Sequence, residues 1–259
     1  MSLDIIADLQ RALADERFFT RWIYRKEIGS TMDLAREMAE MGTPEGTVVI
    51  AGRQRAGRGR RGRGWDSPVG GVWFSLLFRP SIELCRSGCI SVLLAVAIAR
   101  ALRERYGIPV SVKWPNDLML HSKKLGGVLI ELSTVGERIE WLIAGIGINV
   151  NNPLPKETRI PSISLSSALA RPIELEEPLL VILKSIAQSY LRFLREGFEP
   201  IRHMWAEHSA LYSGIWVQKG EDRFEAHVKG LSELGKLIVE RAGRIEELVA
   251  EEVTLSLNG

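Results

Sequence analysis

The residues best suited to chemistry lie in one glycine- and arginine-rich segment, residues 52–65, which reads GRQRAGRGRRGRGW. It holds six arginines and no acidic residue before Asp66. Its glycines let the backbone approach a ligand closely and present N–H groups to an anion, and arginine binds phosphate or carboxylate through paired hydrogen bonds. Because so many like charges repel one another unless anions compensate them, the segment predicts a phosphate- or nucleotide-binding loop. A solvated basic loop is the alternative.

Residues 57–62 also spell G-x-G-x-x-G, the spacing of a dinucleotide-binding motif. That motif needs a helix that begins at its glycines. Here the chain continues through Trp65, Pro68, Gly70 and Gly71, which excludes such a helix. The match is therefore set aside.

A second candidate is the start of a helix at Ser30 and Thr31. Asp33 follows Ser30 at the third position, a spacing typical of a helix N-cap with its capping-box acid. The same helix start offers hydroxyl and N–H groups to a polar ligand. Both interpretations can hold together.

Three further segments place polar groups or glycines at strand ends. Residues 113–117 (KWPND) put a cation, an aromatic ring, an amide and a carboxylate where proline ends a strand. Residues 124–127 (KLGG) bring a lysine to the start of the next strand. Gly145 and Gly147 interrupt an apolar strand before Asn149, which indicates close approach of a ligand or another backbone.

Together these segments resemble the biotin protein ligase family from about Tyr24 to Asn151, and more weakly through the C-terminal tail. The signatures are the GRGRRGR loop between Gln54 and Trp65, KWPND, KLGG and GIGIN, in the family's order. The sequence departs from the family at Met32, because the usual residue there is asparagine and methionine cannot supply the hydrogen bonds of an amide.

The resemblance implies a two-step reaction that uses biotin, ATP and Mg²⁺. Biotin is first converted to biotinyl-5′-AMP and then transferred to a lysine of a biotin carboxyl carrier protein. The implied biotin-binding residues are Ser30, Thr31, Gln54, Gly57, Arg58, Gly59, Arg60, Trp114, Lys124 and Gly127. The implied nucleotide-binding residues are Arg58, Arg60, Trp65, Asn116 and Asn149. Arg60, Lys124 and Asp117 are the expected catalytic residues, and no metal ligand is assigned.

The elements that must position these residues follow from hydrophobic periodicity. Helices are predicted at residues 3–14, 30–41, 87–105, 175–195 and 198–209. Strands are predicted at residues 22–27, 47–51, 72–78, 110–114, 125–132 and 138–150. The strands at residues 125–132 and 138–150 are predicted to pair around a turn that contains Gly136. This mixture with hairpin-like pairs favours an α+β fold over a strict βαβ repeat.

The tail from Gly214 changes character, because short β-like runs alternate with glycines, which is typical of a small β-barrel. We place a domain boundary near Ser213. The resemblance implies a class II aminoacyl-tRNA synthetase-like catalytic domain over residues 1–213 and an SH3-like domain over residues 214–259.

The composition excludes several other classes of protein. With 34 Lys and Arg against 32 Asp and Glu among 259 residues, the net charge is +2, so nucleic-acid binding would rest on the arginine loop alone. Two cysteines, Cys85 and Cys89, exclude a disulfide scaffold and a four-cysteine zinc site, and they are predicted to be small buried residues. The sequence offers no signal peptide and no long uninterrupted apolar run, so we expect a cytoplasmic protein without a spanning helix.

Three alternatives stay open from the sequence alone. A lipoate-type acyl-protein ligase would share the adenylation chemistry, although the polar set of Ser30, Thr31 and Gln54 favours biotin. A nucleic-acid-binding protein would use the Arg/Gly loop, and a biotin sensor would bind without catalysis. Some relatives carry an N-terminal DNA-binding domain, and the short stretch before the match predicts none here; a homodimer is expected because the family often dimerises.

Overall fold

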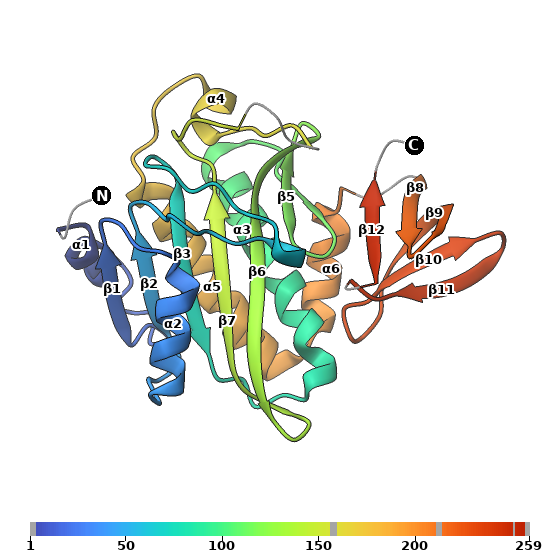
Figure 1. Cartoon of the computed structure of the whole chain (residues 1–259), viewed down its shortest axis with the longest axis horizontal. Helices are drawn as coiled ribbons and strands as arrows, with labels where there is room; N and C mark the ends of the chain where they lie inside the picture. The colour runs from blue at the N-terminus through green and yellow to red at the C-terminus, as the bar shows by residue number, and fades with distance from the viewer. Residues whose placement is uncertain (1–3, 156–159, 211–213, 251, 257–259) are drawn as a thin grey trace.

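The computed structural model describes residues 4–155, 160–210, 214–250 and 252–256, and this part of the chain forms two β-sheets and six α-helices (Figure 1). The helices are α1 (Asp4–Ala12), α2 (Thr31–Glu40), α3 (Ser87–Tyr106), α4 (Leu165–Leu169), α5 (Glu176–Glu196) and α6 (Glu199–His208). The first sheet contains β1 (Arg21–Arg25), β2 (Thr47–Ala51), β3 (Val72–Phe78), β4 (Ser111–Lys113), β5 (Asp117–Leu120), β6 (Lys123–Val135) and β7 (Arg138–Ile148). The second contains β8 (Gly214–Lys219), β9 (Asp222–Leu231), β10 (Leu237–Arg241), β11 (Arg244–Leu248) and β12 (Val253–Ser256).

The seven-stranded sheet has the order β1-β2-β3-β7-β6-β5-β4. Only β1 and β2 run parallel among its paired strands, and the other neighbours are antiparallel. The arrangement confirms the predicted α+β class and the predicted hairpin of β6 and β7. Because β6 pairs with β7 from Gly126 to Val135, the two strands bring the KLGG and GIGIN segments side by side, with Gly127 opposite Gly147.

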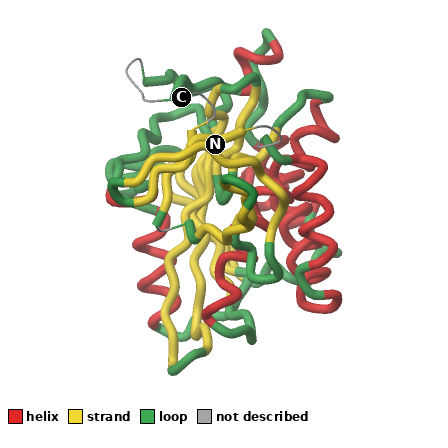
Figure 2. Tube along the Cα trace, turned by 90° about the vertical axis from the view of Figure 1, so that its right-hand side faces the viewer, coloured by secondary structure: helices red, strands yellow, loops and turns green. Residues whose placement is uncertain are grey.

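Helices cover both faces of this sheet, α2 on one and α3 with α5 on the other (Figure 2). Strands β2 and β3 are buried along their whole length, which explains why their sequences are almost entirely apolar. Their residues alternate between two cores. Val48 and Ile50 join the large core with α3, whereas Val49 joins a smaller core with Met32 and Ala35 of α2.

Helix α3 is the central helix of the large core. It ends at Gly107, whose left-handed φ of 66° is the conformation that glycine readily supplies at a helix C-terminus. Within the described residues, the length and composition of the segment Leu84–Tyr106 would allow it to cross a membrane, although the sequence analysis predicted no such helix. Here the helix packs against α5 and is mostly buried, as expected of the core helix of a folded domain.

The sequence predictions were wrong or incomplete at a few elements. Cys85 is exposed in a short 3₁₀ turn, Leu84–Arg86, while Cys89 is buried on α3, where burial raises the pKa of its thiol to about 12. Strand β5 follows the proline turn directly and was not predicted, nor were β11 and the five-residue α4. The proposed boundary at Ser213 lies outside the described residues.

The five-stranded sheet, ordered β11-β10-β9-β8-β12, packs beside the first sheet. The indole N–H of the buried Trp114 donates a 2.9 Å hydrogen bond to the Gly235 carbonyl. The Cys89 thiol approaches the Glu233 carbonyl at 3.4 Å. These contacts join the loop between β9 and β10 to the end of β4, next to the KWPND segment, and to the start of α3.

Candidate active site

A cavity of about 690 Å³ lies where the arginine loop, the start of α2, strands β5–β7 and strand β12 meet. It gathers the predicted site residues Ser30, Thr31, Gln54, Arg58, Gly59, Arg60, Trp65, Trp114, Asn116, Asp117, Lys124, Gly127 and Asn149. Gly57 alone among the predicted residues is absent from its lining. A Cβ there would lie 2.4 Å from the Trp65 carbonyl oxygen, so Gly57 lets the two arms of the loop approach each other.

One end of the cavity is formed by the first turn of α2. Ser30 is the N-cap, and its hydroxyl accepts a hydrogen bond from the Met32 N–H at 3.3 Å. The Thr31 N–H and hydroxyl both donate to Gln54 Oε1, at 2.8 and 3.0 Å. Gln54 Nε2 donates to the Ser67 hydroxyl at 3.0 Å. The predicted N-cap is confirmed, and these polar groups are held in place before any ligand arrives.

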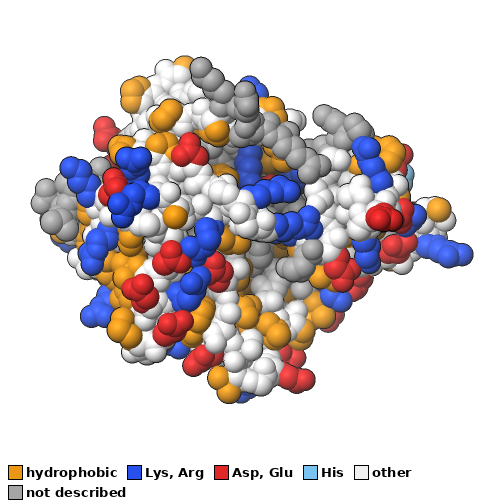
Figure 3. Space-filling view, viewed as in Figure 1, with side chains coloured by type: hydrophobic (Ala, Val, Ile, Leu, Met, Phe, Trp, Pro, Cys, Tyr) orange, Lys and Arg blue, Asp and Glu red, His pale blue; other side chains and the backbone are white. Residues whose placement is uncertain are grey.

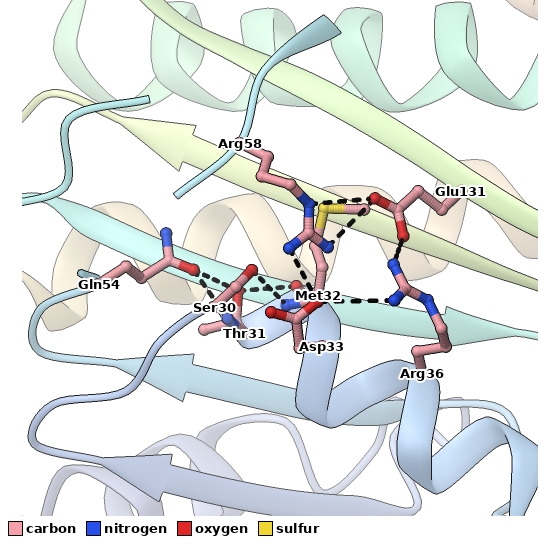
Figure 4. Close-up of polar contacts among 9 residues, drawn as sticks. Ser30, Thr31, Met32, Asp33, Arg36, Gln54, Arg58 and Glu131 are labelled. Carbon is pink, nitrogen blue, oxygen red and sulfur yellow. Dashed lines mark hydrogen bonds and ion pairs between the residues drawn. The ribbon is translucent and has the colours of Figure 1, made fainter. Parts of the chain in front are cut away.

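Asp33 has a different role from the capping acid that its position suggested. Its carboxylate pairs with the Arg58 guanidinium at 2.8 Å and with Arg36 at 3.6 Å. Glu131, on β6, pairs with the same two arginines and lies 3.2 Å from Arg58. Figure 4 shows the two acids and two arginines closing a ring beside Met32. The hydrogen bond that the Arg36 guanidinium donates to the Glu131 carboxylate raises the pKa of Arg36 above its usual value.

The opposite wall carries a lysine and a carboxylate from neighbouring strands. Lys124 Nζ lies 2.7 Å from Asp117 Oδ1, and both side chains are largely buried, with 25% of Lys124 and 19% of Asp117 exposed. The ammonium also lies 5.1 Å from the centre of the Trp65 ring. Asp117 and Trp65 therefore hold the Lys124 charge at the cavity wall.

Two glycines of β7 make room for side chains above the sheet. A Cβ on Gly147 would lie 2.5 Å from Trp65 Nε1, and one on Gly145 would lie 2.5 Å from the Met32 sulfur. The sequence predicted that a ligand or another backbone approaches this strand closely. In the structure the side chains of Trp65 and Met32 do so. The buried indole N–H of Trp65 has no hydrogen-bond partner in the described part of the chain.

The arginine loop is held by contacts at three places. Arg58 pairs with Asp33 and Glu131, and Arg60 donates to Asn116 Oδ1 at 3.2 Å and to the Ala250 carbonyl. Arg61 donates to the Val253 carbonyl at 2.9 Å. Protein carboxylates and carbonyls thus offset part of the like-charge repulsion that the sequence led us to assign to a bound anion alone. Figure 3 shows Lys and Arg side chains gathered on this face, where the two sheets meet.

Comparison with known proteins places this geometry in a family. Residues 24–149 match the model of the biotin/lipoate A/B protein ligase family. The bifunctional ligase/repressor BirA of Bacillus subtilis is 33% identical over 254 residues, which cover 96% of this chain and 78% of that relative. The chain belongs to the biotin/lipoate A/B protein ligase family.

Two further relatives are biotin ligases by name. The biotin–[acetyl-CoA-carboxylase] ligase of Paracoccus denitrificans is 29% identical over 212 residues, covering 79% of this chain and 88% of that protein. The solved structure of the biotin protein ligase of Aquifex aeolicus in complex with biotin and ATP has a TM-score of 0.81 and 33% identity, covering 92% of this chain and 99% of that one. The predicted resemblance to biotin protein ligases is confirmed.

The ligase cavity also contains residues that sequence reasoning missed. Met32 was set aside because it lacks an amide, yet it is buried and lines the cavity as an apolar wall. Met119 and residues 253–256 also line it. The contribution of residues 253–256 had no signal in the sequence, since strand β12 reaches the site only through the packing of the second sheet.

Proposed function

We propose that this ligase-family chain is an ATP-dependent enzyme that forms biotinyl-5′-AMP and transfers biotin to a lysine of a biotin carboxyl carrier protein. The observation that carries the proposal is that two groups of polar side chains, far apart in the sequence, line one cavity. One group is Ser30 with Gln54, and the other is Asp117 with Lys124. The names of the relatives and the biotin and ATP bound to the Aquifex aeolicus ligase support it.

The α2 end of the cavity suits the ureido ring of biotin. This ring is neutral and needs directional donors and acceptors, which Ser30, Thr31 and Gln54 supply from fixed positions. Met32, Gly127 and Trp114 offer apolar surface for the sulfur ring and the acyl chain. The carboxylate of biotin would then extend towards Lys124.

The first step joins the biotin carboxylate oxygen to the α-phosphorus of ATP and releases pyrophosphate. The chain supplies position and charge for this step rather than a covalent intermediate. Lys124 and Arg60 would hold the carboxylate and the α-phosphate. Trp65 would stack on adenine, and Asn149 would contact the nucleotide; its side chain is buried and hydrogen-bonded to Asn152 at 3.1 Å.

Mg²⁺ would enter this site with ATP. Among the described residues no group of three or more His, Cys, Asp or Glu side chains could hold a metal ion. The cavity wall nevertheless offers the oxygens of Asn116 and Asp117, and Mg²⁺ is commonly bound by one or two protein oxygens together with substrate phosphates. The ion would neutralise phosphate charge.

In the second step the lysine amine of the carrier attacks the carbonyl carbon of the mixed anhydride, and AMP leaves. The amine must lose a proton, and Asp117 is our candidate acceptor. We further propose a class II aminoacyl-tRNA synthetase-like catalytic domain over residues 1–213, an SH3-like domain over residues 214–259, and a homodimer. The separate sheet order of β8–β12 supports this division.

The proposal is tested by pyrophosphate exchange. The purified chain should catalyse biotin-dependent incorporation of labelled pyrophosphate into ATP, and it should add one biotin to an apo carrier domain, detected by mass spectrometry. Lipoate serves as the parallel substrate. Exchange with lipoate and none with biotin would instead assign the chain to lipoate-type ligases.

Changing Gly147 to alanine tests the role of Trp65. The new Cβ would lie 2.5 Å from the indole nitrogen, so the ring must move from its place above β7. Overpacking of this size costs about 1–3 kcal/mol, and we expect the KM for ATP to rise about tenfold in the exchange assay, since about 1.4 kcal/mol corresponds to tenfold. Gly29→Ala is the control, because its Cβ would meet nothing within 4 Å. An unchanged KM in Gly147→Ala would remove Trp65 from the nucleotide site.

A further inference from the structure

The ring of Asp33, Arg36, Arg58 and Glu131 links three separate parts of the chain. Arg58 belongs to the arginine loop, Asp33 and Arg36 lie on α2, and Glu131 lies on β6 (Figure 4). Each acid contacts both arginines. The formal charge of the four side chains sums to zero, so the Arg58 guanidinium is already neutralised by protein groups.

The position of the ring relates it to the biotin end of the cavity. Arg58 lines the cavity, and Asp33 lies on the same helical turn as Thr31. The loop is therefore joined to this turn twice, through the Gln54–Thr31 hydrogen bonds and through the Arg58–Asp33 ion pair. Glu131 fixes the other side of the same guanidinium to β6.

We infer that Asp33 and Glu131 are positioning residues for biotin binding, which act by holding Arg58 so that the loop backbone at Arg58 and Gly59 stays over the bound biotin. This inference rests on the proposed function. Arg36 contributes by pairing with the second oxygen of Glu131, which leaves Oε1 directed at Arg58. None of the acids needs to touch the substrate in this role.

The arrangement predicts a specific kinetic pattern. The side chains of Arg58, Asp33 and Glu131 are 26–43% exposed, so one ion pair alone contributes little. We expect Asp33→Asn and Glu131→Gln each to raise the KM for biotin about threefold, and the double variant about tenfold. Release of biotinyl-5′-AMP should accelerate by a similar factor, while kcat and the KM for ATP change less than twofold.

The experiment pairs these kinetics with trypsin cleavage of the ligand-free chain, with each cut site identified by mass spectrometry. Cleavage after Arg58 should be about tenfold faster in the double variant than in the unmodified chain. Glu27→Gln is the matched control, because Glu27 pairs with Arg53 and Arg55 of the same loop, and none of the three lines the cavity. It should leave cleavage after Arg58 and the KM for biotin unchanged. Thermal unfolding of every variant establishes that it is folded.

Two results would overturn the inference. One is cleavage after Arg58 at the same rate in the double variant and the unmodified chain, which would mean that the acids do not hold the loop. The other is faster cleavage with an unchanged KM for biotin, which would make the ring purely structural. Absence of biotin-dependent exchange in the unmodified chain would instead refute the proposed function, and the cleavage result would still report whether the acids hold Arg58.

Discussion

Replacing Lys124 with alanine is expected to lower the rate of biotin-dependent pyrophosphate exchange by about 10²–10³-fold, the usual loss when one positioned charge is removed from a transition state. Lys124 Nζ is held at the cavity wall by Asp117 at 2.7 Å and by the face of Trp65. Its ammonium is therefore fixed before substrates bind, so it costs little reorganisation during the reaction. The exchange rate at saturating biotin and ATP measures the effect.

Lys123 provides the internal control for this prediction. It neighbours Lys124 on β6, but its side chain is exposed and lies outside the cavity lining. Lys123→Ala should leave exchange within about twofold of the unmodified rate, as for most surface changes. Because Lys124→Ala leaves the Asp117 carboxylate without its ion-pair partner, the double variant with Asp117→Asn should be measured as well. Equal rates for Lys123→Ala and Lys124→Ala would exclude Lys124 from the reaction.

Replacing Arg60 with alanine should reduce exchange by about 10²-fold, through loss of a charge-assisted contact to the α-phosphate. Arg60 lines the cavity and is already aimed by its hydrogen bond to Asn116 Oδ1 at 3.2 Å. The KM for ATP should rise and kcat should fall, since the same contact would serve both binding and reaction. Initial rates over a series of ATP concentrations separate the two effects.

Arg55 is the matched control for Arg60. It belongs to the same loop, its side chain is 67% exposed, and its ion pair is with Glu27 outside the cavity. Arg55→Ala should therefore retain almost full activity. If both substitutions reduced exchange equally, the effect would come from the basic character of the loop as a whole, and Arg60 would lose its individual role.

Much of the fold could be predicted because its signals are local. Residues 47–51 and 72–78 form strands with the predicted bounds, since each is an apolar run buried on both faces. Strand β11 lacks such a signal: Arg244–Leu248 buries only Leu248, and its charged residues give no alternation to detect. Strand β5 was not predicted because it begins directly after the proline turn, whose residues were interpreted as the end of a strand.

The candidate site was predicted by resemblance, and its contacts needed the fold. Asp33 looked like a capping acid because the helix start explains it locally, whereas its partner Arg58 is brought to it by the loop. Glu131 had no recognisable motif. It meets Arg58 because β6 lies next to β7, one of the strands that α2 packs against, a relation that depends on strand order rather than on spacing in the sequence.

Strand β12 has a consequence for the order in which this protein becomes active during synthesis. Residues 253–256 supply part of the cavity wall, and the Val253 carbonyl accepts a hydrogen bond from the Arg61 guanidinium. Most of the residues proposed to bind biotin and ATP emerge from the ribosome much earlier, and domains generally fold from the N-terminal side as they emerge. A nascent chain can therefore form the seven-stranded sheet and still have an open site. Biotin activation should begin only after translation has passed residue 256 and the second sheet has docked.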